Sequence, residues 1–349
     1  MSVEPKQPEP EQRGLKQQFR AMAQGAQSLA IAYIGVVNGL FAALKGLGQA
    51  DANALASAAR MDAAYVRRWC DAAYAFFYLE AEGDTFRLAE SGAAMLPDAQ
   101  GTLMPMAAQA ILNMHMAERG AALMRTGARP GEQVMAERET LLPWFGPMLE
   151  ASFSEFFEQT ICPNVPIFAE VDARGGLVVD LGCGNGWYLR ALARRCGAVH
   201  GLGLDGFDEN IAQANRLAAA EGFGDRLRFA SGDAHAFSLE APADIIAMNR
   251  ALHHVWEAGG RPFIRRLREN LRPGGAAIIW EPDWPANRAA LRAPSRRGLA
   301  FQNLSEHMQG NHLLCADEIA SAFSAEDMKP EIFRFADGQE AIIVARRPV

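Results

Sequence analysis

The second half of the chain alternates short apolar runs with segments of helical character, and this alternation constrains the fold more than any other feature. Five runs rich in aliphatic and β-branched residues follow one another from Gly176 onward, and they read LVVDLG, HGLGLD, LRFASGD, ADIIAMN and AAIIWEP. Strands that alternate with helices form a parallel sheet covered by helices on both faces. We therefore predict a doubly wound, Rossmann-like α/β domain over residues 171–349.

Two further strand-like runs close the chain around a short turn. The segment EIFRFADGQEAIIVARR places Asp337 and Gly338 between them. So short a turn forces the two strands to pair antiparallel. Together with the five earlier runs, this pair predicts a seven-stranded, mostly parallel sheet.

The first run ends in a glycine-rich turn, VVDLGCGNG, which lies immediately before a helix. A dinucleotide fingerprint needs a third glycine at the point where the helix packs closely on the strand. Gly182 and Gly184 fit that pattern, but Trp187 occupies the third position and Gly186 comes one residue early. A nicotinamide-dependent oxidoreductase is therefore the least favoured interpretation of this turn.

Acidic residues follow three successive strands, at the point where each strand ends. Asp180 ends the first, Asp205 ends the second and Asp233 follows the third. The carboxyl ends of parallel strands meet at one edge of a sheet, where a carboxylate can accept hydrogen bonds from both ribose hydroxyls of an adenosine. Because carboxylates also favour a cationic ligand over a phosphate, the pattern predicts a site for a small adenosine-containing cation.

These motifs resemble those of the class I methyltransferases that use S-adenosylmethionine. VVDLGCGNG matches the first motif, Asp205 the second and GDAH the third, and LRPGGAAIIWEPD follows the fourth strand. The resemblance implies S-adenosylmethionine as cofactor and S-adenosylhomocysteine as product. Asn249 stands where the family commonly has a lysine. The implied cofactor site consists of Asp180, Gly182, Gly184, Gly186, Asp205, Asp233, Ala234 and Asn249.

Residues 20–98 read helix, turn, helix and hairpin, which is the order of a winged helix. The turn between the helices lies at Met61 and Asp62, the longer helix starts near Ala63, and two brief strands flank Gly83. With GLFAAL early in the chain and LHH after the fourth strand, the sequence resembles the dimeric small-molecule O-methyltransferases. The resemblance implies a homodimer, held together by a winged-helix dimerisation domain, that acts on a small-molecule substrate.

A winged helix can also read DNA, which leaves a cofactor-sensing transcription regulator as an alternative of another class. The presumed recognition helix offers only Arg67 and Arg68 beside acidic and aromatic residues, and the formal net charge of the chain is −7. Both observations disfavour a phosphate-rich partner. We therefore expect no nucleic-acid partner.

The remaining segments carry less information. Residues 1–19, rich in Pro, Glu and Gln, are predicted to be a disordered tail, and residues 99–170 a helical linker that contributes to the substrate pocket. The apolar run 28–44 is short for a membrane span and is interrupted by Gly and Asn, so no membrane is expected. Five scattered cysteines without a CxxC pair favour a cytoplasmic location.

The stretch ADIIAMNRALHHVWEAGG leads from the fourth strand into a loop at the predicted edge of the site. In the similar family this motif reads Leu-His-Asp-Trp, and its histidine removes the proton of the substrate hydroxyl. Leu252 and His253 match the motif, whereas His254 replaces the aspartate. His253 is therefore predicted to be the general base, a role for which imidazole has a suitable pKa.

Other side chains are candidates for the substrate site, although ordinary packing explains each of them as well. Glu281 follows the fifth strand, where it can orient His253 or contact substrate. No metal is predicted, because the two later histidines lack an acid cluster of ligand-like spacing. The further candidates are Trp144, His254, Trp256, His307 and His312.

The acceptor atom is left open between oxygen and sulfur. A hydroxyl acceptor carries a proton that must leave, so it needs a base. A small thioether acceptor, which gives a sulfonium product, has no proton to lose. In an S-methyltransferase His253 would therefore only position the substrate.

Overall fold

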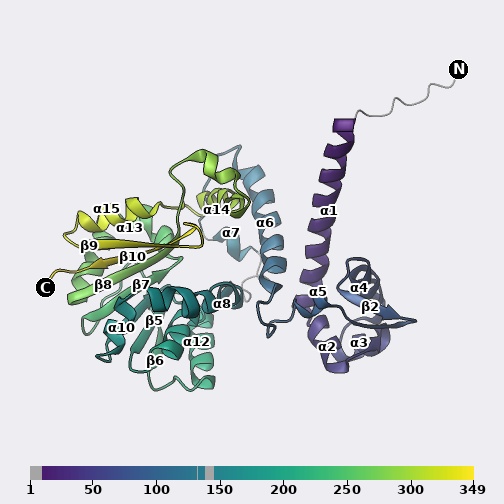
Figure 1. Cartoon of the computed structure of the whole chain (residues 1–349), viewed down its shortest axis with the longest axis horizontal. Helices are drawn as coiled ribbons and strands as arrows, with labels where there is room; N and C mark the ends of the chain where they lie inside the picture. The colour runs from purple at the N-terminus through teal and green to yellow at the C-terminus, as the bar shows by residue number, and fades with distance from the viewer. Residues whose placement is uncertain (1–9, 132, 138–144) are drawn as a thin grey trace. The chain divides into compact units, whose positions relative to one another are not determined.

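The computed structural model describes residues 10–131, 133–137 and 145–349, which divide into two compact units (Figure 1). The first unit ends at His115 and the second begins at Met116. This division falls within helix α6, inside the segment for which the sequence predicts a helical linker.

The first unit has the order of a winged helix. Asp62 caps helix α4, because its carboxylate accepts hydrogen bonds of 3.0 Å from the N–H groups of Ala64 and Tyr65. The wing is the antiparallel pair β2 and β3, and a two-residue strand joins its edge to give the order β1-β3-β2. Its elements are α1 (Pro10–Val37), α2 (Leu40–Leu47), β1 (Ala50–Asp51), α3 (Ala52–Ala59), α4 (Ala63–Ala75), β2 (Leu79–Glu82), β3 (Thr85–Leu88), α5 (Glu90–Ala93) and the first part of α6 (Met104–Leu123).

Helix α1 corrects one prediction. The sequence predicts a disordered tail over residues 1–19, but α1 already begins at Pro10, and residues 1–9 lie outside the described part of the chain. Proline fits the first turn of a helix, and the glutamate, glutamine, leucine and lysine that follow it are good helix formers. The prediction was wrong over residues 10–19 because it weighed polarity and not helix propensity.

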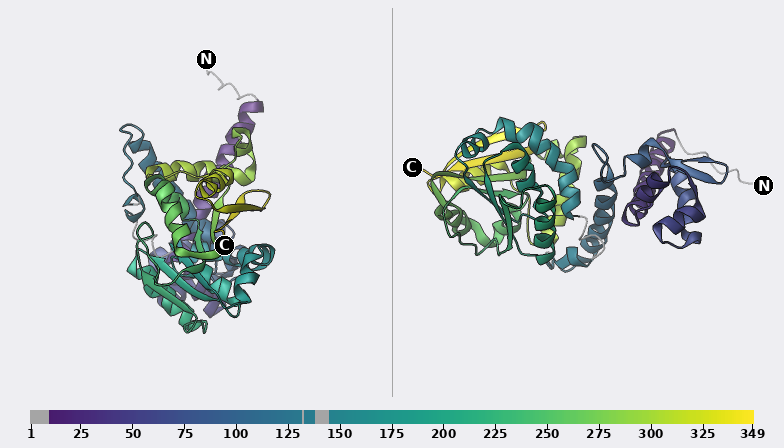
Figure 2. Two further views of the ribbon diagram at one scale, coloured as in Figure 1. Left: turned by 90° about the vertical axis from the view of Figure 1, so that its left-hand side faces the viewer. Right: turned by 90° about the horizontal axis from the view of Figure 1, so that it is seen from below.

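The second unit is built on a seven-stranded sheet with the order β6-β5-β4-β7-β8-β10-β9. Strands β4 to β8 pair in parallel, and β10 pairs antiparallel with both β8 and β9. The predicted doubly wound fold is therefore confirmed (Figure 2). The strands are β4 (Leu177–Leu181), β5 (His200–Asp205), β6 (Leu227–Ser231), β7 (Ala243–Asn249), β8 (Leu271–Pro282), β9 (Lys329–Phe335) and β10 (Glu340–Arg346).

Buried apolar clusters cover both faces of this sheet. Val178 and Ile245 belong to one cluster, and their chain neighbours Val179 and Ile246 belong to the other, because successive side chains of a strand point to opposite faces. The remaining segments of the second unit are α7 (Gln133–Ala136), α8 (Phe145–Phe156), η2 (Phe157–Ile161), α9 (Cys162–Asn164), α10 (Ile167–Asp172), α11 (Trp187–Arg195), α12 (Asp208–Ala220), α13 (Leu252–Asn270), η3 (Arg288–Arg292), η4 (Pro294–Arg296), α14 (Arg297–Met308) and α15 (Ala316–Ser324).

Within the described residues, no single helix is both long and apolar enough to cross a bilayer. Two helical segments, Gly14–Val37 and Leu40–Leu47, are long and apolar enough only when they are taken together, and the chain bends by 68° between them.

Candidate functional site

The glycine turn after β4 has a backbone that favours glycine. Gly182, Gly184 and Gly186 have φ angles of +72°, +52° and +76°, which side-chain-bearing residues rarely adopt. The N–H of Gly182 donates to the carbonyl of Leu204 at 2.8 Å, which ties the turn to the end of β5. A Cβ at Gly186 would also lie 2.6 Å from the ring of Phe229. The turn therefore brings bare backbone to the carboxyl edge of the sheet.

Asp205, at the end of β5, holds this turn and the start of the next helix. One carboxylate oxygen accepts the N–H of Gly184 at 2.8 Å. The other accepts the N–H of Phe207 at 3.0 Å and the side-chain amide of Asn210 at 3.1 Å. These bonds fix the carboxylate at the edge where the sequence predicts it to meet a ribose.

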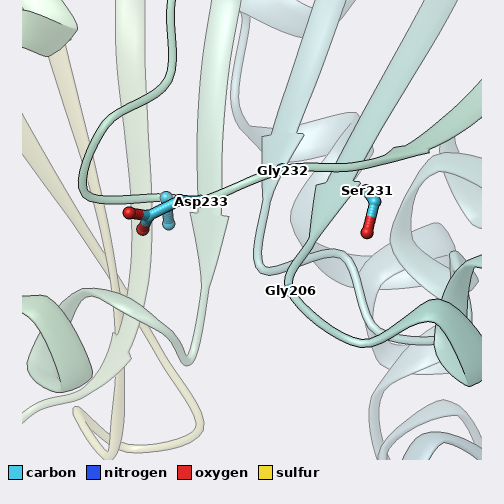
Figure 3. Close-up of a pocket in the computed structure, with 5 residues that line it drawn as sticks. Gly206, Ser231, Gly232 and Asp233 are labelled. Atoms are coloured by element: carbon cyan, nitrogen blue, oxygen red, sulfur yellow. The ribbon is translucent and has the colours of Figure 1, made fainter.

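A pocket of about 440 Å³ opens beside Asp205, where β5 and β6 end (Figure 3). Its wall contains Gly206, Ser231, Gly232, Asp233 and Ala234. Asp233 is exposed, and its carboxylate accepts the N–H of His235 at 2.8 Å. Two of the predicted cofactor residues thus line one cavity.

Asp180 is buried beneath the turn, and Asn249 lies against it. The side-chain amide of Asn249 donates to the Asp180 carboxylate at 2.9 Å. Burial raises the pKa of Asp180 to about 8, since the charge of Asp205 adds to the effect and the bond from Asn249 only partly opposes it. From the sequence, Asp180 is predicted to be an ionised acid that attracts a cation. With a pKa of about 8, however, its carboxyl group is mostly protonated near neutral pH.

The residues present fit S-adenosylmethionine. Within the described part of the chain, the buried side-chain oxygen of Asn249 has no hydrogen-bond partner, so it can accept a bond from a ligand. A Cβ at Gly184 would meet no atom within 4 Å, which leaves space above the turn. Asp205 and Asp233 add acceptors at the ends of neighbouring strands. Together these groups form a polar cradle with room for an adenosine.

His253 lies in the first turn of helix α13 and is 2% exposed. Its ring Nδ1 lies 2.8 Å from one carboxylate oxygen of Glu281, and its backbone N–H donates to the other oxygen at 3.3 Å. Glu281 therefore orients the ring, which is one of the two roles that the sequence leaves open for it. With the proton held on Nδ1, the lone pair of the ring lies on Nε2.

The charges around His253 shift its pKa upward. Burial by itself lowers the pKa of His253, but the carboxylates of Glu281 and Glu306 outweigh it, so that the pKa lies above its ordinary value near 6.5. Burial tends to raise the pKa of Glu281 as well, yet the neighbouring imidazole holds it below the usual range. The pair stabilises an imidazolium next to a carboxylate.

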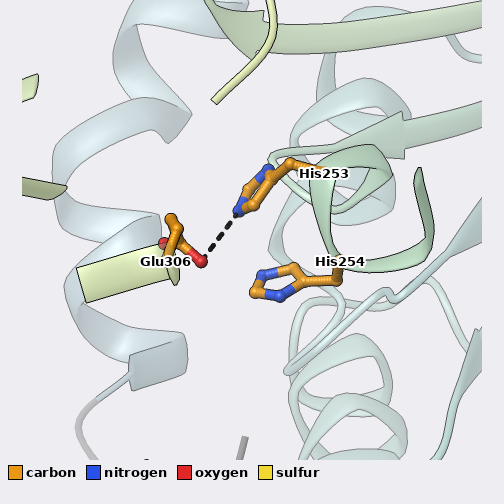
Figure 4. Close-up of side chains that lie close together, drawn as sticks. All are labelled: His253, His254 and Glu306. Carbon is orange, nitrogen blue, oxygen red and sulfur yellow. Dashed lines mark ion pairs between the residues drawn. The ribbon is translucent and has the colours of Figure 1, made fainter. Parts of the chain in front are cut away.

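Glu306 was missed by the sequence reasoning. It lies on α14 and is buried, and its carboxylate oxygen lies 3.7 Å from Nε2 of His253 (Figure 4). The ring of His254 lies beside that of His253, with the ring centroids 4.1 Å apart. Asn311, also buried, lies 3.0 Å from Nδ1 of His254. The sequence predicts only His307 and His312 of this segment as substrate-site candidates.

The other candidate residues that the structure describes have surroundings of their own. Trp256 is half-buried and packs against the apolar cluster on its face of the sheet. His307 is exposed, and His312 pairs with Glu257 at 3.0 Å. Trp144 lies outside the described residues.

Arg250 is a second residue that the sequence did not suggest. It has a φ of +56°, which is strained for a side-chain-bearing residue. Its guanidinium lies 4.0 Å from the ring centroid of Phe153 and forms an ion pair with Glu340. Glu340 also accepts the indole N–H of Trp280 at 2.7 Å. This arrangement fixes the backbone between Asn249 and His253.

Comparisons with known proteins agree with this geometry. Residues 178–275 match the family model described as a methyltransferase domain. A trans-aconitate 2-methyltransferase from Streptomyces avermitilis is 33% identical over 114 residues, which cover 32% of this chain and 42% of that protein. The chain therefore spans less than half the length of this curated relative.

Solved structures resemble the chain over nearly its whole length. N,N-8-amino-8-demethyl-D-riboflavin dimethyltransferase from Streptomyces davawensis aligns with a TM-score of 0.71 at 18% identity, over 97% of this chain and 100% of that one. Human N-acetylserotonin methyltransferase aligns with a TM-score of 0.69 at 16% identity, over 99% and 100%. At such identities the likeness concerns the fold. The chain thus contains a class I S-adenosylmethionine-dependent methyltransferase domain, and its fold is like that of these two solved methyltransferases.

Proposed function

We propose that the protein transfers a methyl group from S-adenosylmethionine to a hydroxyl oxygen of a small molecule, with His253 as general base. The observation that carries this proposal is the buried contact between His253 and Glu281. It directs the basic nitrogen of a neutral imidazole away from Glu281.

S-adenosylmethionine, when bound, supplies an electrophilic methyl group. Asp205, Asp233 and Asn249 provide acceptors for its polar groups, and the glycine turn leaves space for it. Nε2 of His253 accepts the hydroxyl proton as the acceptor oxygen becomes the nucleophile. Glu281 is a positioning residue: it holds the Nδ1 proton and stabilises the imidazolium that results. The burial of both groups limits competition from water.

Replacement of the imidazole tests the base. His253→Ala is expected to lower kcat by about 10²- to 10⁴-fold, while the affinity for S-adenosylhomocysteine stays within about twofold. His200→Ala is the matched control, because His200 is exposed and begins β5, at the end of the strand opposite Asp205. If His253→Ala turns over as fast as the wild type while it binds the cofactor normally, His253 is not the general base.

Transfer to a thioether is the second candidate, and the raised pKa of His253 favours it. A raised pKa leaves a smaller fraction of the imidazole neutral at a given pH, which makes His253 a poorer base there, but the ring can still position a substrate. Screening phenols, enols and thioethers as acceptors, with detection of S-adenosylhomocysteine, decides between the two.

We further propose that the protein is a homodimer in the cytoplasm, with the first unit as its dimerisation domain. Leu15, Phe19 and Met22 support this proposal. They are 56%, 63% and 58% exposed and lie on one face of α1, because their spacings are four and three residues. A second copy of the chain is an occupant that would bury this face.

A further inference from the structure

We propose that His253, His254 and Glu306 bind a divalent first-row transition metal ion, for which zinc is the best fit. One ligand atom from each side chain lies within 4.8 Å of the other two. Figure 4 shows both imidazole rings turned toward the Glu306 carboxylate. His253 and Glu306 are buried and His254 is half-buried, so an ion at this place would be largely shielded from water.

The spacing of the atoms suits a bridging ion better than a direct bond. The 3.7 Å between Nε2 of His253 and the Glu306 oxygen is too long for a hydrogen bond. Two ligands of a tetrahedral zinc ion lie roughly 3.3–3.5 Å apart, since each is about 2.0–2.1 Å from the metal. The ligand atoms, which lie within 4.8 Å of one another, must approach by up to about 1.5 Å for such a site, a change within reach of rotation about the side-chain torsions of Glu306.

The hydrogen bonds behind the two rings also fit metal binding. Glu281 holds the Nδ1 proton of His253, which leaves Nε2 as the ligand atom. The amide of Asn311 lies 3.0 Å from Nδ1 of His254, and rotation of this amide presents its oxygen to a proton on that nitrogen. Histidines that bind metals usually hold their second nitrogen in this way. Two histidines and one carboxylate leave further coordination positions open, as in catalytic zinc sites.

The proposed metal site does not depend on the proposed methyl transfer. Binding is measured without cofactor or acceptor, so it can succeed or fail independently of the enzyme's activity. The two do share Nε2 of His253, whose lone pair an ion would occupy. If His253 is the base, Zn²⁺ is expected to inhibit turnover, and a chelator is expected to restore it.

The test is a titration of the untagged, chelator-treated full chain with Co²⁺ and then Zn²⁺. We expect one Co²⁺ per chain, with visible absorption bands that Zn²⁺ abolishes by displacement. His254→Ala and Glu306→Gln should each weaken binding by more than about tenfold. His200→Ala, the control at an exposed histidine, should bind like the wild type.

Thermal denaturation establishes whether each variant is folded. If His254→Ala is not folded, the metal affinity of Glu306→Gln alone decides whether the ion binds at this site. Absence of stoichiometric binding by the wild type would overturn the proposal. Equal binding by wild type and both ligand variants would overturn it as well, because the ion would then lie elsewhere.

Discussion

At the scale of single residues, the burial of Asp180 links cofactor binding to proton uptake and release. Its carboxylate receives a hydrogen bond from Asn249, and its pKa is raised to about 8. A positive charge placed nearby favours the ionised form and lowers this pKa again. A cationic ligand and the Asp180 proton therefore compete for the same site.

Calorimetry measures that competition directly. Titration of the protein with S-adenosylmethionine at pH 7 is expected to release up to about one proton per site. The binding enthalpy should then vary with the ionisation enthalpy of the buffer. Asp180→Asn, which keeps the shape of the side chain, should abolish that dependence. A binding enthalpy of the wild type that is the same in all buffers would contradict the linkage.

The surroundings of His253 lead to a prediction about how kcat/KM varies with pH. The carboxylates of Glu281 and Glu306 raise its pKa above 6.5, and the neutral imidazole needed for proton removal forms only above that pKa. For a hydroxyl acceptor, kcat/KM should therefore rise with pH through a pKa above 6.5 and then level off. Glu281→Gln should move the rise to lower pH and lower the plateau, because it removes a negative charge and the acceptor that fixes the ring. A profile that is flat across this range would favour a thioether.

At the scale of elements, helix α1 has an exposed apolar face formed by Leu15, Phe19 and Met22. We propose that a second copy of the chain covers this face. Burial of an exposed aromatic or aliphatic side chain contributes roughly 1.5–3 kcal/mol. Phe19→Glu should therefore weaken dimerisation by at least about tenfold. Gln17→Glu introduces the same carboxylate on the opposite side of the helix, so it serves as the control. Light scattering after size-exclusion chromatography measures the mass, and a wild-type chain that is monomeric at high concentration would remove the proposal.

The elements differ in how far the sequence could predict them. The strands β4 to β8 were predictable, since each contains a short apolar run and helices follow β4, β5 and β7, as crossovers between parallel strands require. The turn before α4 was predictable because Asp62 is a strong capping residue. The first turns of α1 were not, because a Pro- and Glu-rich segment suits both a disordered tail and an exposed helix.

At the scale of the whole molecule, cofactor binding should stabilise the folded chain. A ligand at 100 times its Kd adds about 2.7 kcal/mol to the free energy of unfolding of the unit that binds it. S-adenosylhomocysteine should therefore raise the Tm of the wild type. Asp205→Ala should lose this increase, since it removes the side chain that holds Gly184. Differential scanning fluorimetry measures both, and an unchanged increase in the variant would contradict the placement of the site.

The candidate site was predictable where local sequence determines position. Asp180 and Asp205 lie at the carboxyl ends of β4 and β5, and Asp233 follows β6, so parallel pairing alone brings them to one edge. Glu306 was not predictable, because α14 approaches His253 through a segment whose path no periodic pattern specifies. The protonation of Asp180 also lay beyond the sequence, since it depends on how completely the fold buries the group.

The position of β10 in the sheet has a consequence for synthesis on the ribosome. β10 lies between β8 and β9, although β9 precedes it in the chain. A nascent chain that has emerged only as far as β9 therefore has β8 with one unpaired edge, and the apolar Ile278 and Ile279 lie on that strand. Unpaired apolar edges invite association with other chains. The sheet can close only after Arg346 has left the exit tunnel, so this edge of β8 stays open until the whole of β10 has been made.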